Sequence, residues 1–150
     1  MTDQVTNAPL DADQDWEPWN YGDPFEAANG VIFRSRTFVP TEEERVRIGF
    51  RVRPENCNFL GGCHGGLIAS LVDIAMGRNV IAATGVAGAP TMSMTVDFVR
   101  GSAAGDWLES RVRIVRQARS VVFCDTLLIG AAGIIARGNG VFSLPRTVPS

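Results

Sequence analysis

The segment Asn58-Phe-Leu-Gly-Gly-Cys-His-Gly-Gly66 runs directly into a mostly apolar stretch from Leu67 to Ala83. Polar residues interrupt this stretch and it is too short for a good membrane span, so it predicts a helix buried in a soluble core. We expect the helix to begin near His64-Gly65-Gly66, because glycine permits unusual backbone angles and close approach of a ligand. A polar amide, the only histidine, a glycine pair and a lone carboxylate, Asp73, thus share one short segment. This is the layout of a functional site.

Two groups on the expected helix are candidates for chemistry. The first amides of a helix have no intrahelical partner and lie at the positive end of its dipole, so the Gly65 N–H is a candidate donor to an oxygen that becomes negative. Asp73 is expected on a helix face of small residues, which leave room beside the carboxylate for a substrate or a water. Because carboxylates are seldom buried alone, the alternative interpretation is an acid that caps a loop or pairs with an arginine.

The spacing of these two groups adds a constraint. Gly65 and Asp73 are eight positions apart, which is roughly 12 Å along one helix at ~1.5 Å per residue. A reacting carbon must lie ~3 Å from both its oxyanion donor and its attacking group. If both residues are catalytic, a two-fold dimer is expected, with Gly65 of one subunit facing Asp73 of the other.

The rest of the chain predicts antiparallel strands. From 45 to 53, apolar residues alternate strictly with arginines, which is typical of a half-buried strand. Turn signals separate further expected strands over 31–39, 91–99, 107–116, 120–129 and 134–142. One long apolar helix among antiparallel strands is an α+β layout in which the sheet wraps around the helix.

The composition indicates one soluble domain. At 150 residues and 45% hydrophobic, the chain can bury a core without the disulfides or structural metals that very small domains need. Its three cysteines lack the paired spacing of a zinc site, so no metal is expected. We interpret residues 1–23 as an acidic, flexible segment and 24–150 as the domain. Nearby aromatic side chains are expected to dock on the domain, namely Trp16, Trp19, Tyr21 and Phe25.

Charge is distributed unevenly along the chain. Residues 1–26 hold seven acids and no basic residue, opposite to a signal peptide, which favours a cytoplasmic location. All 14 basic residues are arginines at or after Arg34, where nine acids remain, so the folded part carries about +5. That charge suits an anionic group such as a phosphate. Without a dense basic run or an aromatic-basic motif, no nucleic-acid partner is expected. The lack of lysine excludes P-loop and Schiff-base chemistry.

At these positions the sequence resembles the hotdog-fold acyl-CoA thioesterases, specifically the PaaI-like branch of the 4-hydroxybenzoyl-CoA thioesterase superfamily. The family pattern of Asn, Gly, His-Gly-Gly and a mid-helix acid is present without a gap as Asn58, Gly61, His64-Gly65-Gly66 and Asp73. The resemblance continues through 91–100, 119–123 and 136–142, and it covers roughly residues 24 to 145. One departure is Cys63, which stands where an aliphatic residue is common.

The resemblance implies a role for each matching residue. Gly65 would donate its backbone N–H to the thioester carbonyl, and Asp73 would act as general base or nucleophile. Asn58 and His64 match positions that orient the attacking water and shape the loop, although His64 is often only structural in this family. Thr91 matches a Ser/Thr position near the attacking water. The expected substrate contacts are Gly66, Ser93 on the same strand face as Thr91, and three arginines for the CoA phosphates, Arg100, Arg116 and Arg119.

The expected reaction is hydrolysis of an acyl-CoA thioester to free acid and CoA, with no metal and no bound cofactor. The expected partners are the acyl-CoA substrate and a second copy of the chain, and the resemblance further implies a dimer of dimers; no membrane partner is expected. The three arginines are alternatively exposed strand residues. The alternative function is a non-catalytic acyl-CoA-binding or sensor module on the same fold. Aromatic, medium and long acyl chains all remain open.

Overall fold

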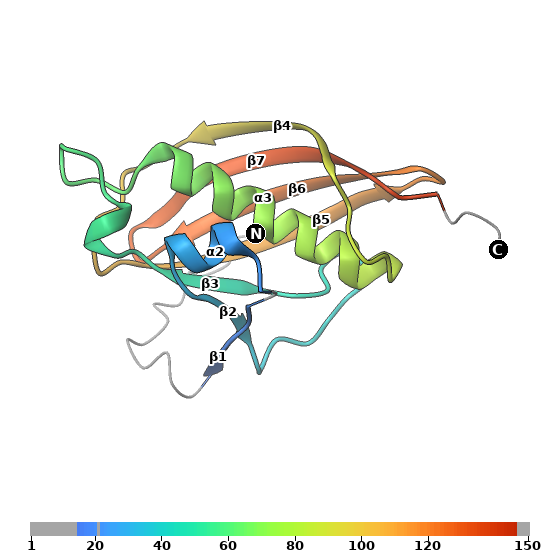
Figure 1. Cartoon of the computed structure of the whole chain (residues 1–150), viewed down its shortest axis with the longest axis horizontal. Coiled ribbons are helices and arrows are strands. Elements are labelled where there is room, and N and C mark those ends of the chain that lie inside the picture. Colours follow the sequence, from blue (N-terminus) through green and yellow to red (C-terminus); the bar gives the residue numbers. More distant parts are fainter. Residues whose placement is uncertain (1–14, 21, 147–150) are drawn as a thin grey trace.

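A computed structural model describes residues 15–20 and 22–146 of the chain. Its helices and strands, labelled in Figure 1, are β1 (Trp16–Pro18), α2 (Pro24–Asn29), β2 (Ile32–Ser35), β3 (Ile48–Arg51), a 3-10 turn (Pro54–Asn56), α3 (Gly65–Thr84), β4 (Thr91–Phe98), β5 (Trp107–Gln117), β6 (Val121–Gly130) and β7 (Gly133–Ser143). The predicted helix begins within the expected His64-Gly65-Gly66 segment. Each predicted strand is present, with shifted ends.

The strands form one sheet, and α3 crosses one face of it (Figure 1). All neighbours are antiparallel, in the order β1-β2-β3-β5-β6-β7-β4. β4, the strand directly after the helix, lies at one edge and pairs with β7 alone among the described strands. This arrangement confirms the α+β prediction of an antiparallel sheet wrapped around one central helix.

The core lies between α3 and the sheet. Glycines on β7 let the helix approach the strand closely, because a Cβ on Gly138 would lie 2.7 Å from Val72 and one on Gly140 would lie 2.9 Å from Met76. By length and composition α3 could cross a membrane, yet half of that apolar window is buried inside the protein. Its buried apolar side chains are Leu67, Ile68, Leu71, Val72, Ala75, Met76 and Val80. The helix ends at Gly85, whose φ of 74° is the left-handed cap that glycine favours.

The described part of the chain already contains a strand before the expected boundary at residue 24. Trp16–Pro18 pairs with β2, and the Trp16 ring is buried against Trp107 with ring centroids 5.1 Å apart. Trp19 packs against the core, as predicted, whereas Phe25 is exposed. Tyr21 lies outside the described residues. Apolar docking of the tryptophans therefore extends the sheet into the acidic segment.

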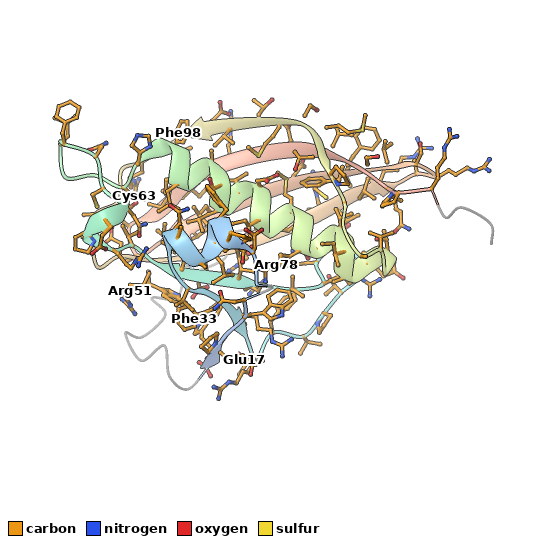
Figure 2. The ribbon with its side chains drawn as sticks, viewed as in Figure 1. Glu17, Phe33, Arg51, Cys63, Arg78 and Phe98 are labelled. Atoms are coloured by element: carbon orange, nitrogen blue, oxygen red, sulfur yellow. The ribbon has the colours of Figure 1, made fainter. Side chains whose placement is uncertain are left out.

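A buried ion pair fixes α2 against the central helix. Glu26 accepts a hydrogen bond from the Arg78 guanidinium, and both side chains are nearly inaccessible. Arg78 also donates to the Trp19 carbonyl and lies over the Trp19 ring. Figure 2 shows Arg78 between α3 and the N-terminal elements. A buried charge needs such partners, so the pair links the chain's start to the core.

The strand expected over 45–53 begins only at Ile48. The Arg45 and Val46 amides both donate to the side-chain oxygen of Asn79, at 2.7 and 3.1 Å. Asn79 is fully buried on α3 and satisfies these amides in place of a neighbouring strand. Ile48 and Phe50 then point into the core, as the alternation predicted.

Candidate active site

The start of α3 leaves one backbone donor free. His64 is the N-cap, and its Nδ1 accepts a hydrogen bond from the Gly66 amide at 2.9 Å. The His64 carbonyl accepts from the amides of Leu67 and Ile68. Within the described part of the chain, the Gly65 N–H makes no hydrogen bond. The predicted oxyanion donor is therefore unoccupied, while the Gly66 amide, predicted as a substrate contact, is already used by the cap.

Gly65 lines a hollow of about 300 Å³ at the start of α3. Its lining includes Gly65, Phe98, Arg100 and Ser102. The Phe98 ring covers the glycine closely, since a Cβ on Gly65 would lie 3.4 Å from it. Sequence reasoning missed Phe98 and Ser102, because their proximity to α3 depends on how β4 ends beside the helix start. The arrangement offers a carbonyl oxygen one backbone donor beside an aromatic wall.

Asn58, predicted to orient the attacking water and to shape the loop, makes hydrogen bonds within its own loop. Its side-chain oxygen accepts from the amides of Leu60 and Gly62, at 3.0 and 3.2 Å. Gly61 has a φ of 84°, which favours glycine at that turn position. The side chains of Phe59 and Leu60 are consequently held at the tip, 96% and 80% exposed. The Asn58 oxygen is thus engaged within its own loop.

Asp73 and Thr91 meet across the helix and the edge strand. The Thr91 hydroxyl donates to Asp73 Oδ1 at 2.6 Å, from β4 to the middle of α3. Such a short bond to a carboxylate fixes the orientation of Asp73 and leaves its second oxygen available. The side chain is only half-buried, so a substrate can reach it. Two residues predicted for the site are therefore in contact.

Ser93 is not on the face predicted for it. A β-bulge between Thr91 and Ser93 shifts the register, so that Thr91 lies opposite Phe142 and Ser93 lies opposite Val141. Phe142 is buried on the helix side of the sheet, and its neighbour Val141 points the other way. Ser93 therefore faces away from α3 and from Asp73, which corrects its assignment as a partner of Thr91.

The three predicted arginines are spread over both ends of the sheet. Arg100 lines the hollow in front of Gly65, and its guanidinium donates to the Ala132 carbonyl in the β6–β7 turn. Arg116 lies near the far end of β5, opposite Phe123, and Arg119 follows in the turn to β6. From Trp107 to Arg116 the strand spans roughly 30 Å. One subunit thus brings only Arg100 to the Gly65 hollow.

The two catalytic candidates of one subunit also remain apart. Both Gly65 and Asp73 belong to the single helix α3, so the spacing of roughly 12 Å holds in the structure. In the described residues, no cluster of three or more His, Cys, Asp or Glu is placed to hold a metal ion. One chain therefore holds the free Gly65 amide and the oriented Asp73 carboxylate at two separate places on α3.

Comparison with known proteins identifies a family that part of this chain resembles. The family model described as "Thioesterase superfamily" matches residues 60–129, a segment that contains α3, the edge strand and both Gly65 and Asp73. This segment is therefore similar to the thioesterase superfamily. Among relatives, a Pseudomonas aeruginosa protein named as a predicted esterase is 29% identical over 105 residues, covering 69% of this chain and 78% of that protein.

Solved structures of related proteins have a similar fold. A mutant of the phenylacetic acid degradation protein PaaI from Thermus thermophilus is 26% identical with a TM-score of 0.66, covering 81% of this chain and 100% of that chain. A hypothetical thioesterase from Streptococcus pneumoniae, solved with coenzyme A, is 21% identical with a TM-score of 0.62, covering 69% of this chain and 83% of that chain. The hotdog fold predicted from the sequence is confirmed.

Proposed function

We propose that this protein hydrolyses acyl-CoA thioesters to a free acid and CoA. The observation that carries the proposal is the presence on α3 of both a free Gly65 amide and an oriented, half-buried Asp73 carboxylate. Acyl transfer requires these two functions: a donor to the developing oxyanion and a group that supplies the attacking oxygen. The superfamily match, and the coenzyme A bound to the Streptococcus pneumoniae relative, support this substrate class.

A two-fold dimer would assemble one complete site from two halves. If Gly65 of one subunit faces Asp73 of the other, the helices cross at the midpoint of these positions, Ala69. The neighbouring positions Gly66, which is exposed, and Ser70, which is half-buried, are also small, so two helices can approach closely there. β4 is an edge strand with unpaired backbone groups along one side, and Met92 and Phe98 are 63% and 59% exposed. Pairing with a partner's β4 would cover this edge.

In this dimer the thioester carbonyl oxygen accepts the Gly65 N–H of one subunit. The partner's carboxylate at position 73 either removes a proton from a water that attacks the carbonyl carbon, or attacks that carbon itself. The tetrahedral intermediate then collapses, the C–S bond breaks, and CoA leaves as a thiolate that takes up a proton. In the second route this leaves a mixed anhydride, which water hydrolyses to the free acid and the restored carboxylate. Thr91 holds the carboxylate by its 2.6 Å hydrogen bond throughout.

CoA phosphates would be held by arginines from both subunits. Arg100 stands at the Gly65 end of one subunit. An antiparallel β4 pair places the opposite sheet end of the partner beside it, and that end carries Arg116 and Arg119. The two-fold thus brings together the arginines that one subunit separates. Each contact between one of these arginines and a CoA phosphate would be a charge-assisted hydrogen bond.

The test is thiol release from a panel of aromatic and aliphatic acyl-CoA esters by wild type and Asp73→Asn. Loss of the base is expected to lower kcat by about 10²-fold or more. Asp97→Asn is the matched control, because Asp97 is an exposed carboxylate on β4 that pairs with Arg137. Normal turnover in a folded Asp73→Asn protein would refute the assignment. CoA binding without turnover by wild type would favour the sensor alternative.

A further inference from the structure

Two cysteines face each other immediately before the candidate site. Cys57 and Cys63 form an isolated antiparallel bridge at the base of the 58–62 loop. Two backbone hydrogen bonds flank the bridge, from the Asn58 amide to the Gly62 carbonyl at 2.7 Å and from the His64 amide to the Asn56 carbonyl at 2.8 Å. Cys57 and Cys63 themselves exchange no backbone hydrogen bond, so they are a non-hydrogen-bonded antiparallel pair.

This pairing class has the spacing of a disulfide. In a non-hydrogen-bonded antiparallel pair the Cα atoms are ~4.5 Å apart and the side chains lie on the same face. Disulfides span Cα distances of about 4.4 to 6.8 Å, most often about 5.5 to 6 Å. Both thiols are free and partly exposed, with Cys57 Sγ near the Arg53 carbonyl and Cys63 Sγ near the His64 carbonyl. Closure therefore requires rotation of the two side chains about Cα–Cβ together with a small widening of the pair toward the usual disulfide spacing.

We infer that Cys57 and Cys63 are a reversible dithiol–disulfide pair that controls the position of the Gly65 amide. A low-molecular-weight disulfide such as oxidised glutathione is the oxidant. The Cys57 thiolate attacks one of its sulfurs and expels one thiol, and the Cys63 thiolate then attacks the Cys57 sulfur and expels the second. The cysteines lose two electrons and two protons, and the oxidant becomes two thiols.

The order of attack follows from burial. Burial raises the pKa of the Cys63 thiol to about 11, and the neighbouring Ser102 hydroxyl opposes this shift only in part. Cys63 is therefore almost entirely protonated at neutral pH, which makes it the slow, second thiol in the exchange. Because its thiolate fraction rises until the pH approaches 11, ring closure should accelerate across that whole range.

Closure acts on the oxyanion end of α3 because the bridge is continuous with it. Cys63 lines the same hollow as Gly65, and its amide donates to the Ser102 carbonyl at 2.7 Å. Figure 2 shows Cys63 beside Phe98 at the start of the helix. Widening the pair from ~4.5 Å toward the usual disulfide spacing moves this segment by about 1 Å. A displacement of that size at a catalytic group can lower the rate by about 10²-fold.

The first experiment measures the bond itself. Native protein is incubated with oxidised glutathione, free thiols are alkylated, and the tryptic peptide Val52–Arg78, which holds both cysteines, is weighed. We expect this peptide to lose the mass of two hydrogen atoms and to escape alkylation until dithiothreitol is added. Cys57→Ser is the control that cannot close. A persistent glutathione adduct, a disulfide between chains or two alkylated cysteines would overturn the inference.

The second readout is hydrolysis of an acyl-CoA ester, and this part rests on the proposed function. Oxidised wild type should turn over at least about tenfold more slowly than reduced protein and recover with dithiothreitol. Cys57→Ser should match the reduced wild type under both conditions. A closed disulfide with unchanged turnover would refute control of Gly65. If the reduced protein cleaves no ester, the proposed function fails, while the peptide mass still decides whether the pair closes.

Discussion

Replacing Gly65 by proline should remove the oxyanion donor and leave the helix intact. Gly65 is the first residue of α3, the position where proline is favoured because the N–H has no intrahelical partner. His64 precedes it with φ −61° and ψ 134°, the extended conformation that a residue before proline adopts. The backbone is therefore already shaped for proline at this position.

Gly65→Ala is the matched control. Both variants add a Cβ, which meets the Phe98 ring at 3.4 Å and so requires little adjustment. Alanine keeps the N–H, whereas the proline ring replaces it. Losing one oxyanion donor costs about 10²–10³-fold in kcat, or about 2.7–4 kcal/mol of transition-state stabilisation. The free energy of unfolding of the proline variant should instead rise, since a proline in a compatible conformation stabilises a protein by about 0.4–1 kcal/mol.

The assay pairs thiol release from acyl-CoA esters with thermal unfolding and a measurement of the dimer. We expect the proline variant to fold, to dimerise, and to turn over about 10²-fold or more slowly than the alanine variant. Equal kcat in the two folded variants would show that the Gly65 N–H is not the oxyanion donor. Loss of activity in both variants would instead show that the added Cβ disturbs the space beside the Phe98 ring.

Three further substitutions test the rest of the site. Thr91→Val keeps the side-chain shape but removes the hydroxyl that donates to Asp73, the proposed catalytic carboxylate, so kcat should fall about tenfold or more. Thr95→Val on the same strand is the control and should leave kcat unchanged. His64→Ala should lower the free energy of unfolding by about 0.5–2 kcal/mol through loss of the N-cap, and His64→Asn should restore it in a thermal melt. Ala69→Leu should separate the dimer in analytical ultracentrifugation and abolish turnover, whereas Ala82→Leu, an exposed position on the same helix, should do neither.

The fold was predictable because its signals are local. An interrupted apolar stretch after a glycine pair predicted α3 almost to its first residue, and alternation predicted the strands. The errors occurred where a side chain from elsewhere replaces a backbone partner. Asn79 takes over the amides of Arg45 and Val46, which delays the start of β3. Nothing near residue 45 in the sequence indicates a helix asparagine 34 positions away.

The sequence indicated the candidate groups of the site but not their neighbours. The motif located Gly65 and Asp73, and the helix rise alone indicated that they stay apart. Ser93 was misplaced because a single bulge residue reverses the face of every later side chain, and strict alternation does not reveal a bulge. The contact between Phe98 and Gly65, and the pairing of the two cysteines, both depend on long-range placement.

The His-Gly-Gly segment also explains why Gly65 in particular carries the free donor. A helix start leaves several amides without intrahelical partners, and any of them could in principle serve an oxyanion. Here the His64 carbonyl takes the amides of Leu67 and Ile68, and its imidazole takes that of Gly66. Of these helix-start amides, the Gly65 amide alone makes no hydrogen bond within the described part of the chain, and Gly65 lines the hollow beside Phe98. The histidine therefore shapes the proposed chemistry through its cap, because the cap selects which amide remains for the substrate.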